Sequence, residues 1–224
     1  MARRKKVFAI NEYYHVYNRG VEKRKIFRDR YDVDRFLQSM IAFNTINPVG
    51  SLRKVYEQKN RGQTPVKAAE VKKEEQLVDI VAYCLNPNHF HLLLYEKTEG
   101  GISEFMKRVL GGYTWYFNNK YERSGTLLQG RFQSSHIDSN EYLLHVSVYV
   151  NLNFRVHQYK KNVLQNILSS FDEYRGSSKH QQEICTKESI LGQFKNKKAY
   201  VDFSEQSLIG ICERKKLVRE LTLE

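Results

Sequence analysis

One strand-turn-strand stretch restricts the fold of this chain more than any other feature. Residues 77–85 (LVDIVAYCL) and 89–95 (HFHLLLY) are apolar runs of strand length, and the Asn-Pro-Asn between them is a turn sequence. Because successive side chains of a strand point to opposite faces, His89 and His91 lie on the same face. The sequence therefore predicts a β-hairpin whose second strand begins with two imidazoles on one face.

Two imidazoles on one strand face can form half of a metal site. Imidazole binds several divalent cations, so the pair does not identify the metal, and a complete site needs at least one more ligand from elsewhere in the chain. An exposed or hydrogen-bonded histidine pair without a metal is the alternative. The spacing of His89 and His91 alone leaves both interpretations open.

Hydrophobic periodicity in the rest of the chain indicates an α+β fold. We expect two further strands, at 12–17 and 127–137, and three helices, at 29–43, 102–121 and 139–154. In chain order these elements read strand, helix, strand, strand, helix, strand, helix. This order favours a small antiparallel sheet with helices packed on one face.

Composition divides the chain into a domain at 1–160 and a helical tail at 161–224. Residues 47–76 lose all periodicity and mix proline, glycine and charges, so we expect a mobile insertion inside the first domain. Within the tail, the apolar spacing predicts helices at 163–174 and 189–203.

The charge balance indicates a polyanionic partner. Lys and Arg total 37 against 25 Asp and Glu, which gives a formal net charge of +12. Fifteen tyrosines and twelve phenylalanines offer stacking surfaces for unpaired bases, although core packing is their ordinary use. The three cysteines form no CxxC motif, and no apolar run has the length of a signal peptide or a membrane span, so we expect a cytoplasmic protein.

A paired glycine interrupts the helix predicted at 102–121. Gly111 and Gly112 lie inside the apolar stripe, where each glycine costs about 1 kcal/mol relative to alanine. We therefore expect a structural reason for the pair, such as a kink or the close approach of another part of the chain.

The helix predicted at 139–154 carries a tyrosine with an amide one turn later. Tyr149 and Asn153 are four residues apart, so their side chains share a face. If this face meets the histidines, Asn153 supplies an oxygen ligand and Tyr149 stands beside the cation. The other helical tyrosines have no coordinating side chain at this spacing. Burial of Tyr149 in the core is the alternative.

Such a constellation supports nucleophilic attack on a phosphodiester. A phenol has a pKa of about 10 and is mostly protonated at neutral pH, so it is a weak nucleophile. A divalent cation that withdraws charge from the phosphate makes a weak nucleophile sufficient. The product is a phosphotyrosine and a free 3′-hydroxyl. This bond conserves the energy of the phosphodiester, in keeping with the absence of a Walker-type phosphate loop.

Several motifs together resemble the HUH single-tyrosine transposases, and most of all their REP-associated branch. They are YHVYNRG at 14–20, NPNHFHLLL at 86–94, GGYTWYFNNKY at 111–121, LLQGRFQSS at 127–135 and YLLHVSVYVNLN at 142–153. The stretch SSFDEYRG at 169–176 is similar to the tail of that branch. One departure is Phe154 after Asn153, where the branch usually has proline.

The resemblance implies a ferredoxin-like fold, a Mg²⁺ or Mn²⁺ cofactor and cleavage of single-stranded DNA near imperfect palindromic hairpins. It places the metal ligands at His89, His91 and Asn153 and the nucleophile at Tyr149, which forms a 5′-phosphotyrosine. It also implies a protein of the bacterial cytoplasm that associates with the nucleoid. A domesticated hairpin-binding protein without cleavage activity, and a replication initiator or relaxase, are alternatives.

Basic and polar side chains outside the catalytic motifs are candidates for DNA contacts. We expect Arg131 and Gln129, in the QGRF stretch, to contact DNA. Lys107 and Arg108 lie off the apolar stripe of their helix. They could form a phosphate-binding face, and ordinary solvated residues are the alternative. Relatives include monomers and homodimers, and the sequence does not decide between them.

Overall fold

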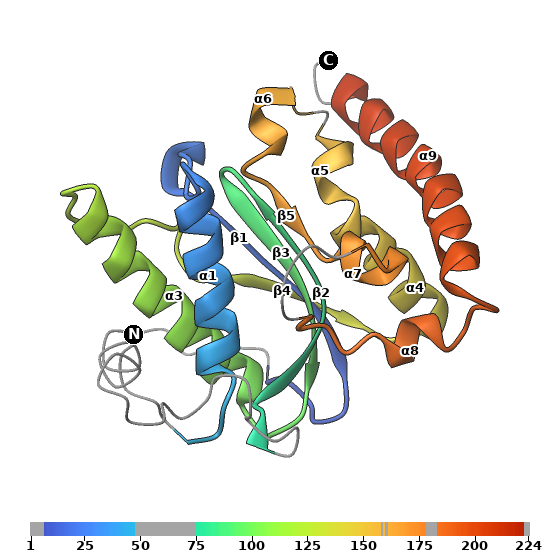
Figure 1. Ribbon diagram of the computed structural model, residues 1–224, viewed down its shortest axis with the longest axis horizontal. Helices are drawn as coiled ribbons and strands as arrows, with labels where there is room; N and C mark the ends of the chain where they lie inside the picture. The colour runs from blue at the N-terminus through green and yellow to red at the C-terminus, as the bar shows by residue number, and fades with distance from the viewer. Residues whose placement is uncertain (1–6, 48–74, 158, 160, 178–182, 222–224) are drawn as a thin grey trace.

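The computed structural model describes residues 7–47, 75–157, 159, 161–177 and 183–221 and centres on one antiparallel sheet (Figure 1). The strand order is β4-β1-β3-β2-β5. The strands are β1 (Tyr13–Arg19), β2 (Val78–Asn86), β3 (His89–Glu96), β4 (Gln133–Ile137) and β5 (Leu168–Ser169). The helices are η1 (Val21–Lys23), α1 (Arg30–Phe43), α3 (Gly101–Lys120), α4 (Asn140–Asn151), α5 (Asn153–Val156), α6 (Lys161–Leu164), α7 (Phe171–Arg175), α8 (Glu188–Leu191) and α9 (Lys197–Leu221).

The first four strands have the ferredoxin-like arrangement. Helix α1 connects β1 to β2, a tight hairpin connects β2 to β3, and α3 connects β3 to β4. All neighbouring strands are antiparallel, and β1 lies between β3 and β4. The predicted α+β class with an antiparallel sheet is therefore confirmed.

Helices cover both faces of the sheet, whereas the sequence predicted them on one. Figure 1 shows α1 and α3 on one side and α4 with α9 on the other. Phe90 and Leu92 of β3 face the first layer, while Leu93 faces the second. Both faces of β3 are apolar beyond its first residues, so each needs a covering layer.

Two predicted boundaries are wrong for local reasons. The strand expected at 127–137 begins only at Gln133, because Gly130 adopts a positive φ of 67° that breaks the extended backbone. The helix expected at 139–154 divides at Leu152 into α4 and α5. Ser139 caps α4 by accepting a hydrogen bond from the Tyr142 backbone N–H.

The sequence predicted a helical tail, but the structure is only partly helical there. The helix expected at 163–174 is interrupted: α6 and α7 occupy its two ends, and between them strand β5 pairs with β2 and adds a fifth strand to the sheet, with Leu168 buried against the core. Residues 189–203 likewise divide between α8 and α9. The insertion expected at 47–76 lies mostly outside the described residues. None of the helices in the described ranges combines the length and apolarity of a membrane span.

The glycine pair in α3 marks a close approach to α1. A Cβ at Gly112 would lie 2.9 Å from Cε2 of Phe43, whereas a Cβ at Gly111 would meet nothing within 4 Å. Phe43 is buried in the core, so its ring has little room to move. The close approach of another segment, which was expected to explain the glycine pair, is therefore found at Gly112 and not at Gly111.

This asymmetry predicts opposite effects of two neighbouring substitutions. Gly111→Ala should stabilise the protein by about 0.5–1 kcal/mol, because alanine is the better helix former. Gly112→Ala gains the same propensity but crowds Phe43, and overpacking of this kind typically costs about 1–3 kcal/mol. Urea unfolding of both variants checks the difference, and equal stabilisation by both would contradict the close packing of α1 on α3.

Candidate active site

The β2-β3 hairpin holds His89 and His91 at the start of β3. Both imidazoles are nearly buried, and their ring centroids are 5.1 Å apart. Phe90, between them, is fully buried on the opposite face. The predicted alternation of side chains along this strand is therefore confirmed.

Each of these imidazoles has its Nδ1 engaged by a neighbour. His89 Nδ1 lies 2.7 Å from Oδ1 of Asn88, and His91 Nδ1 lies 2.8 Å from Nε2 of His15 on β1. Because Asn88 Oδ1 is an acceptor, His89 Nδ1 carries the proton and its Nε2 has a free lone pair. Such a partner on the far nitrogen is how metal-binding histidines are ordinarily oriented.

Asn153, the first residue of α5, lies against His89. Its Oδ1 is 3.2 Å from His89 Nε2 and accepts a hydrogen bond of 2.9 Å from Asn86 Nδ2. Asn86 Nδ2 also lies 3.1 Å from His89 Nε2. The Asn86 amide nitrogen is therefore the shared donor for two acceptors, His89 Nε2 and Asn153 Oδ1. Asn86 Oδ1 and Asn153 Nδ2, both buried, have no partner among the described residues.

Tyr149 of α4 stands beside the other imidazoles. Its ring meets His91 and His15 edge to face, with centroid distances of 5.5 and 5.7 Å. Burial raises the pKa of this phenol above 10, and the nearby Asn153 side chain opposes part of that rise. The phenol is therefore protonated at neutral pH.

The phenol opens into a cavity, so it is not an ordinary core residue. A pocket of about 530 Å³ lies against Tyr149. Its lining residues come from β1, β3, the loop before β4, the start of β4, α4 and the end of α5, and are Tyr17, Asn18, Arg19, His89, His91, Gln129, Gln133, Tyr149 and His157. Tyr149 and the two histidines therefore share one accessible space.

Burial keeps the histidines of this pocket neutral. It lowers the pKa of His89 and of His15 to about 4, and lowers that of His91 well below 6.5. Neutral imidazole is the form that coordinates cations. No group of three or more His, Cys, Asp or Glu side chains suited to a metal occurs in the described part of the chain. The donor set gathered here is two imidazoles and an amide oxygen.

Comparison with known proteins identifies the family. Residues 8–153 match the family described as "Transposase IS200 like". This chain belongs to the IS200-like transposase family. The matched region ends at Asn153 and contains both histidines and Tyr149.

One solved structure similar to this transposase is that of a REP-associated tyrosine transposase bound to a REP hairpin. It is 14% identical, with a TM-score of 0.47, and the similarity covers 84% of this chain and 96% of that one. A search of the curated proteins finds no match.

The predicted DNA-contact residues of this IS200-like transposase fall in two places. Gln129 lines the pocket and accepts hydrogen bonds from the Arg19 guanidinium, and Arg131 is exposed two residues later. Lys107 and Arg108 lie on α3, across the sheet from the histidines, and both pair with Glu104. Of these four residues, Gln129 is the one that lines the pocket together with Tyr149.

The sequence analysis missed two groups that contact the histidine pair of the transposase site. His15 carries no signal that separates it from a structural histidine, because only the pairing of β1 with β3 brings it to His91. Asn86 was read as part of the turn. Its position opposite His89 in a two-residue hairpin turn was the available signal, because directly paired residues share a face.

Proposed function

We propose that this IS200-like transposase nicks single-stranded DNA and transfers the strand through a covalent 5′-phosphotyrosine on Tyr149. The observation that carries the proposal is the meeting of Tyr149 and Asn153 with His89 and His91 in one pocket. Tyr149 and Asn153 follow the two histidines by about sixty residues in the sequence. The resemblance to the REP-associated branch supports an imperfect palindromic hairpin beside the cleaved strand.

The reaction follows from the position of the phenol. The Tyr149 oxygen attacks the scissile phosphorus and loses its proton, and the bond between phosphorus and the 3′-oxygen breaks. The 3′-oxygen takes up a proton and leaves as a hydroxyl. Attack by a 3′-hydroxyl on the phosphotyrosine reverses the step and joins a strand without ATP.

A divalent cation, Mg²⁺ or Mn²⁺, fits the side chains of this site. His89 Nε2 and Asn153 Oδ1 lie 3.2 Å apart, and both are acceptors directed at the same place, which the Asn86 amide donor serves in this structure and a cation could serve in its stead. His89, His91 and Asn153 would hold the cation, and beside them the buried acceptor Asn86 Oδ1 has no hydrogen-bond partner among the described residues. When bound, the cation neutralises charge on the phosphate and stabilises the charge that develops.

The DNA strand would run over the mouth of the pocket. Gln129, together with Arg19, stands at the wall of the pocket, and Arg131 is exposed beside them. We assign these groups to the strand next to the scissile phosphate. Lys107 and Arg108 would reach only DNA that wraps to the opposite side of the sheet.

The polarity of the covalent bond tests the proposal. A pool of single-stranded stem-loops with randomised flanks is incubated with the protein and Mn²⁺, with label at either the 5′ or the 3′ end. A 5′-phosphotyrosine retains the 3′-labelled fragment on the protein and releases the 5′-labelled fragment with a free 3′-hydroxyl. EDTA should abolish both products. Retention of the 5′-labelled fragment would contradict the proposed chemistry.

His15 should act through His91 on the affinity for the cation. If His91 donates from Nδ1 to His15, the Nε2 lone pair of His91 is directed into the pocket. His15→Ala should then weaken Mn²⁺ binding by about 10–100-fold, as for other partners of metal-binding histidines. Calorimetric titration measures this. His136→Ala, on the neighbouring strand and exposed, is the control that should bind Mn²⁺ as the wild type does.

A further inference from the structure

A second hollow is also lined by Tyr149. Its volume is about 640 Å³, and it shares three lining residues with the first pocket, namely Tyr17, His91 and Tyr149. Tyr149 therefore borders two cavities that have lining residues in common. A polynucleotide whose phosphate reaches this phenol has one strand segment on each side of that phosphate, so it needs space on both sides.

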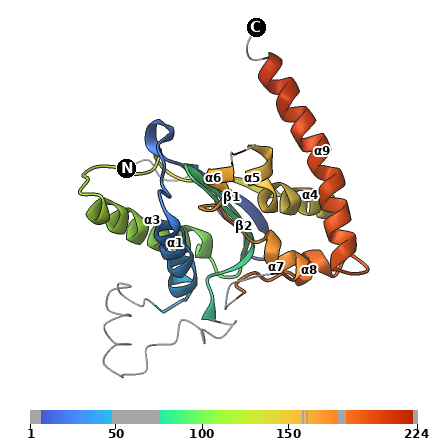
Figure 2. The same ribbon diagram turned by 45° about the horizontal axis from the view of Figure 1, so that its top comes forward.

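Helix α9 supplies one wall of this second hollow. Ile211 and Arg214 of α9 line it opposite Tyr142 and Tyr149 of α4. Figures 1 and 2 show α9 running beside α4 and α5. Near its end, Lys215 Nζ donates to the backbone oxygen of Val156 at 3.1 Å and holds α9 against α5. The family match ends at Asn153, so this wall lies outside it.

The side chains of the second hollow suit one nucleotide. Tyr142 is 42% exposed and lies two turns before Tyr149, so both rings are on the same side of α4. The Arg214 guanidinium is exposed and has no ion pair or hydrogen bond within the described residues. Glu141 and His145 also line the hollow, and Arg214 is the one Lys or Arg among its described lining residues.

We propose that this hollow binds the nucleotide next to the scissile phosphate, with its base stacked on Tyr142 and its phosphate held by Arg214. The inference builds on the proposed function and adds a role for the C-terminal helix in it. Stacking on an aromatic ring tolerates any base, and a guanidinium recognises phosphate without reading sequence. The subsite therefore contributes affinity and position, and leaves base recognition to other parts of the protein.

DNA binding tests this subsite without any need for cleavage. The probe is a fluorescein-labelled oligothymidylate of twenty nucleotides, bound in the Tyr149→Phe background and followed by fluorescence anisotropy at several salt concentrations. Tyr142→Ala should weaken binding about tenfold, within the range for loss of one stacked base, while Tyr142→Phe retains wild-type affinity. Arg214→Gln should reduce the slope of log affinity against log salt by about 0.7, the loss of one phosphate contact.

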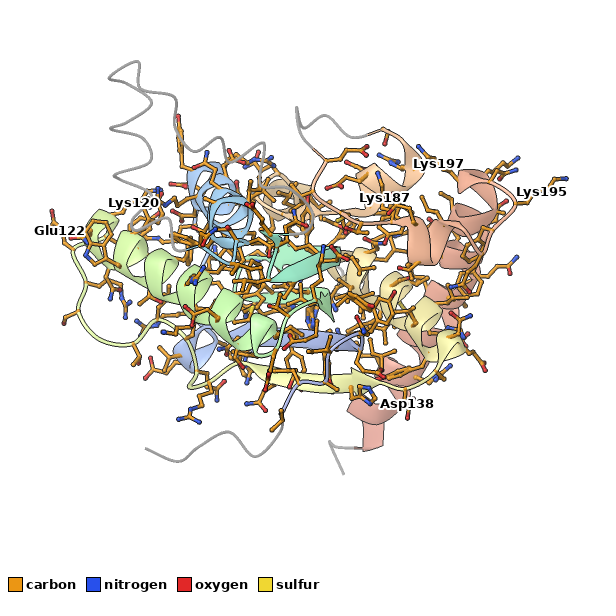
Figure 3. The ribbon with its side chains drawn as sticks, turned by 90° about the horizontal axis from the view of Figure 1, so that it is seen from below. Lys120, Glu122, Asp138, Lys187, Lys195 and Lys197 are labelled. Atoms are coloured by element: carbon orange, nitrogen blue, oxygen red, sulfur yellow. The ribbon has the colours of Figure 1, made fainter. Side chains whose placement is uncertain are left out.

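Lys195→Gln is the matched control for Arg214. Figure 3 shows Lys195 pointing outward ahead of α9, and roughly 25 Å of helix separates the start of α9 from Arg214. The control removes the same charge and should leave the salt slope unchanged. Equal slopes for Arg214→Gln and Lys195→Gln, or wild-type binding by Tyr142→Ala, would overturn the subsite. Covalent capture by the wild type is measured separately, so loss of the subsite and loss of the proposed cleavage give different results.

Discussion

Replacing Tyr149 by phenylalanine is expected to remove covalent capture of DNA completely. The substitution deletes only the hydroxyl and keeps the ring that packs edge to face on His15 and His91. Affinity for single-stranded DNA should therefore stay within about twofold, since the stacking surface is unchanged. Denaturing gel electrophoresis of the protein with labelled stem-loops and Mn²⁺ measures the adduct.

Tyr17→Phe is the matched control for this prediction. Tyr17 also lines both cavities and stacks on His91 with a centroid distance of 5.7 Å, so it loses the same atom in the same surroundings. It should retain the adduct. An adduct that survives in Tyr149→Phe and disappears in Tyr17→Phe would move the nucleophile from α4 to β1.

Replacing His89 by alanine is expected to have the second largest effect. The variant loses the one imidazole whose Nε2 faces Asn153, and Mn²⁺ affinity should fall by more than about 100-fold, beyond the loss produced by an indirect partner. Cleavage should fall with it. Titration of free Mn²⁺ by electron paramagnetic resonance measures the affinity directly, without DNA.

Asn153→Ala should also lower the affinity for Mn²⁺, because it removes a carbonyl oxygen, a ligand type that suits this cation. His136→Ala serves again as the exposed histidine control. Wild-type Mn²⁺ affinity in His89→Ala would place the cation elsewhere and remove the role assigned to this pocket.

The parts of the site that the sequence predicted depend on local periodicity. The placement of His89 and His91 on one face follows from the two-residue period of a strand. The joint orientation of Tyr149 and Asn153 follows from the helical turn, and it survives the division of the helix at Leu152.

The parts that the sequence did not predict depend on contacts between distant segments. His15 reaches His91 only because β1 lies beside β3, and Arg214 reaches the second hollow only because α9 folds back along α4. Strand β5 is two residues long and has no periodicity to detect, so its pairing with β2 was missed. The sequence failed to predict the helices on the second face of the sheet for the same reason. Apolar residues on both sides of a strand do not say which helix covers each face.

Mass spectrometry of the covalent complex tests the central claim most directly. The protein is incubated with the stem-loop pool and Mn²⁺, digested with nuclease and trypsin, and the modified peptide is sequenced. We predict a nucleotide joined through its 5′-phosphate to Tyr149, in the peptide that follows Arg131 and ends at Arg155. A nucleotide on any other residue would contradict the account, as would the absence of a modified peptide from a sample in which DNA has been cut.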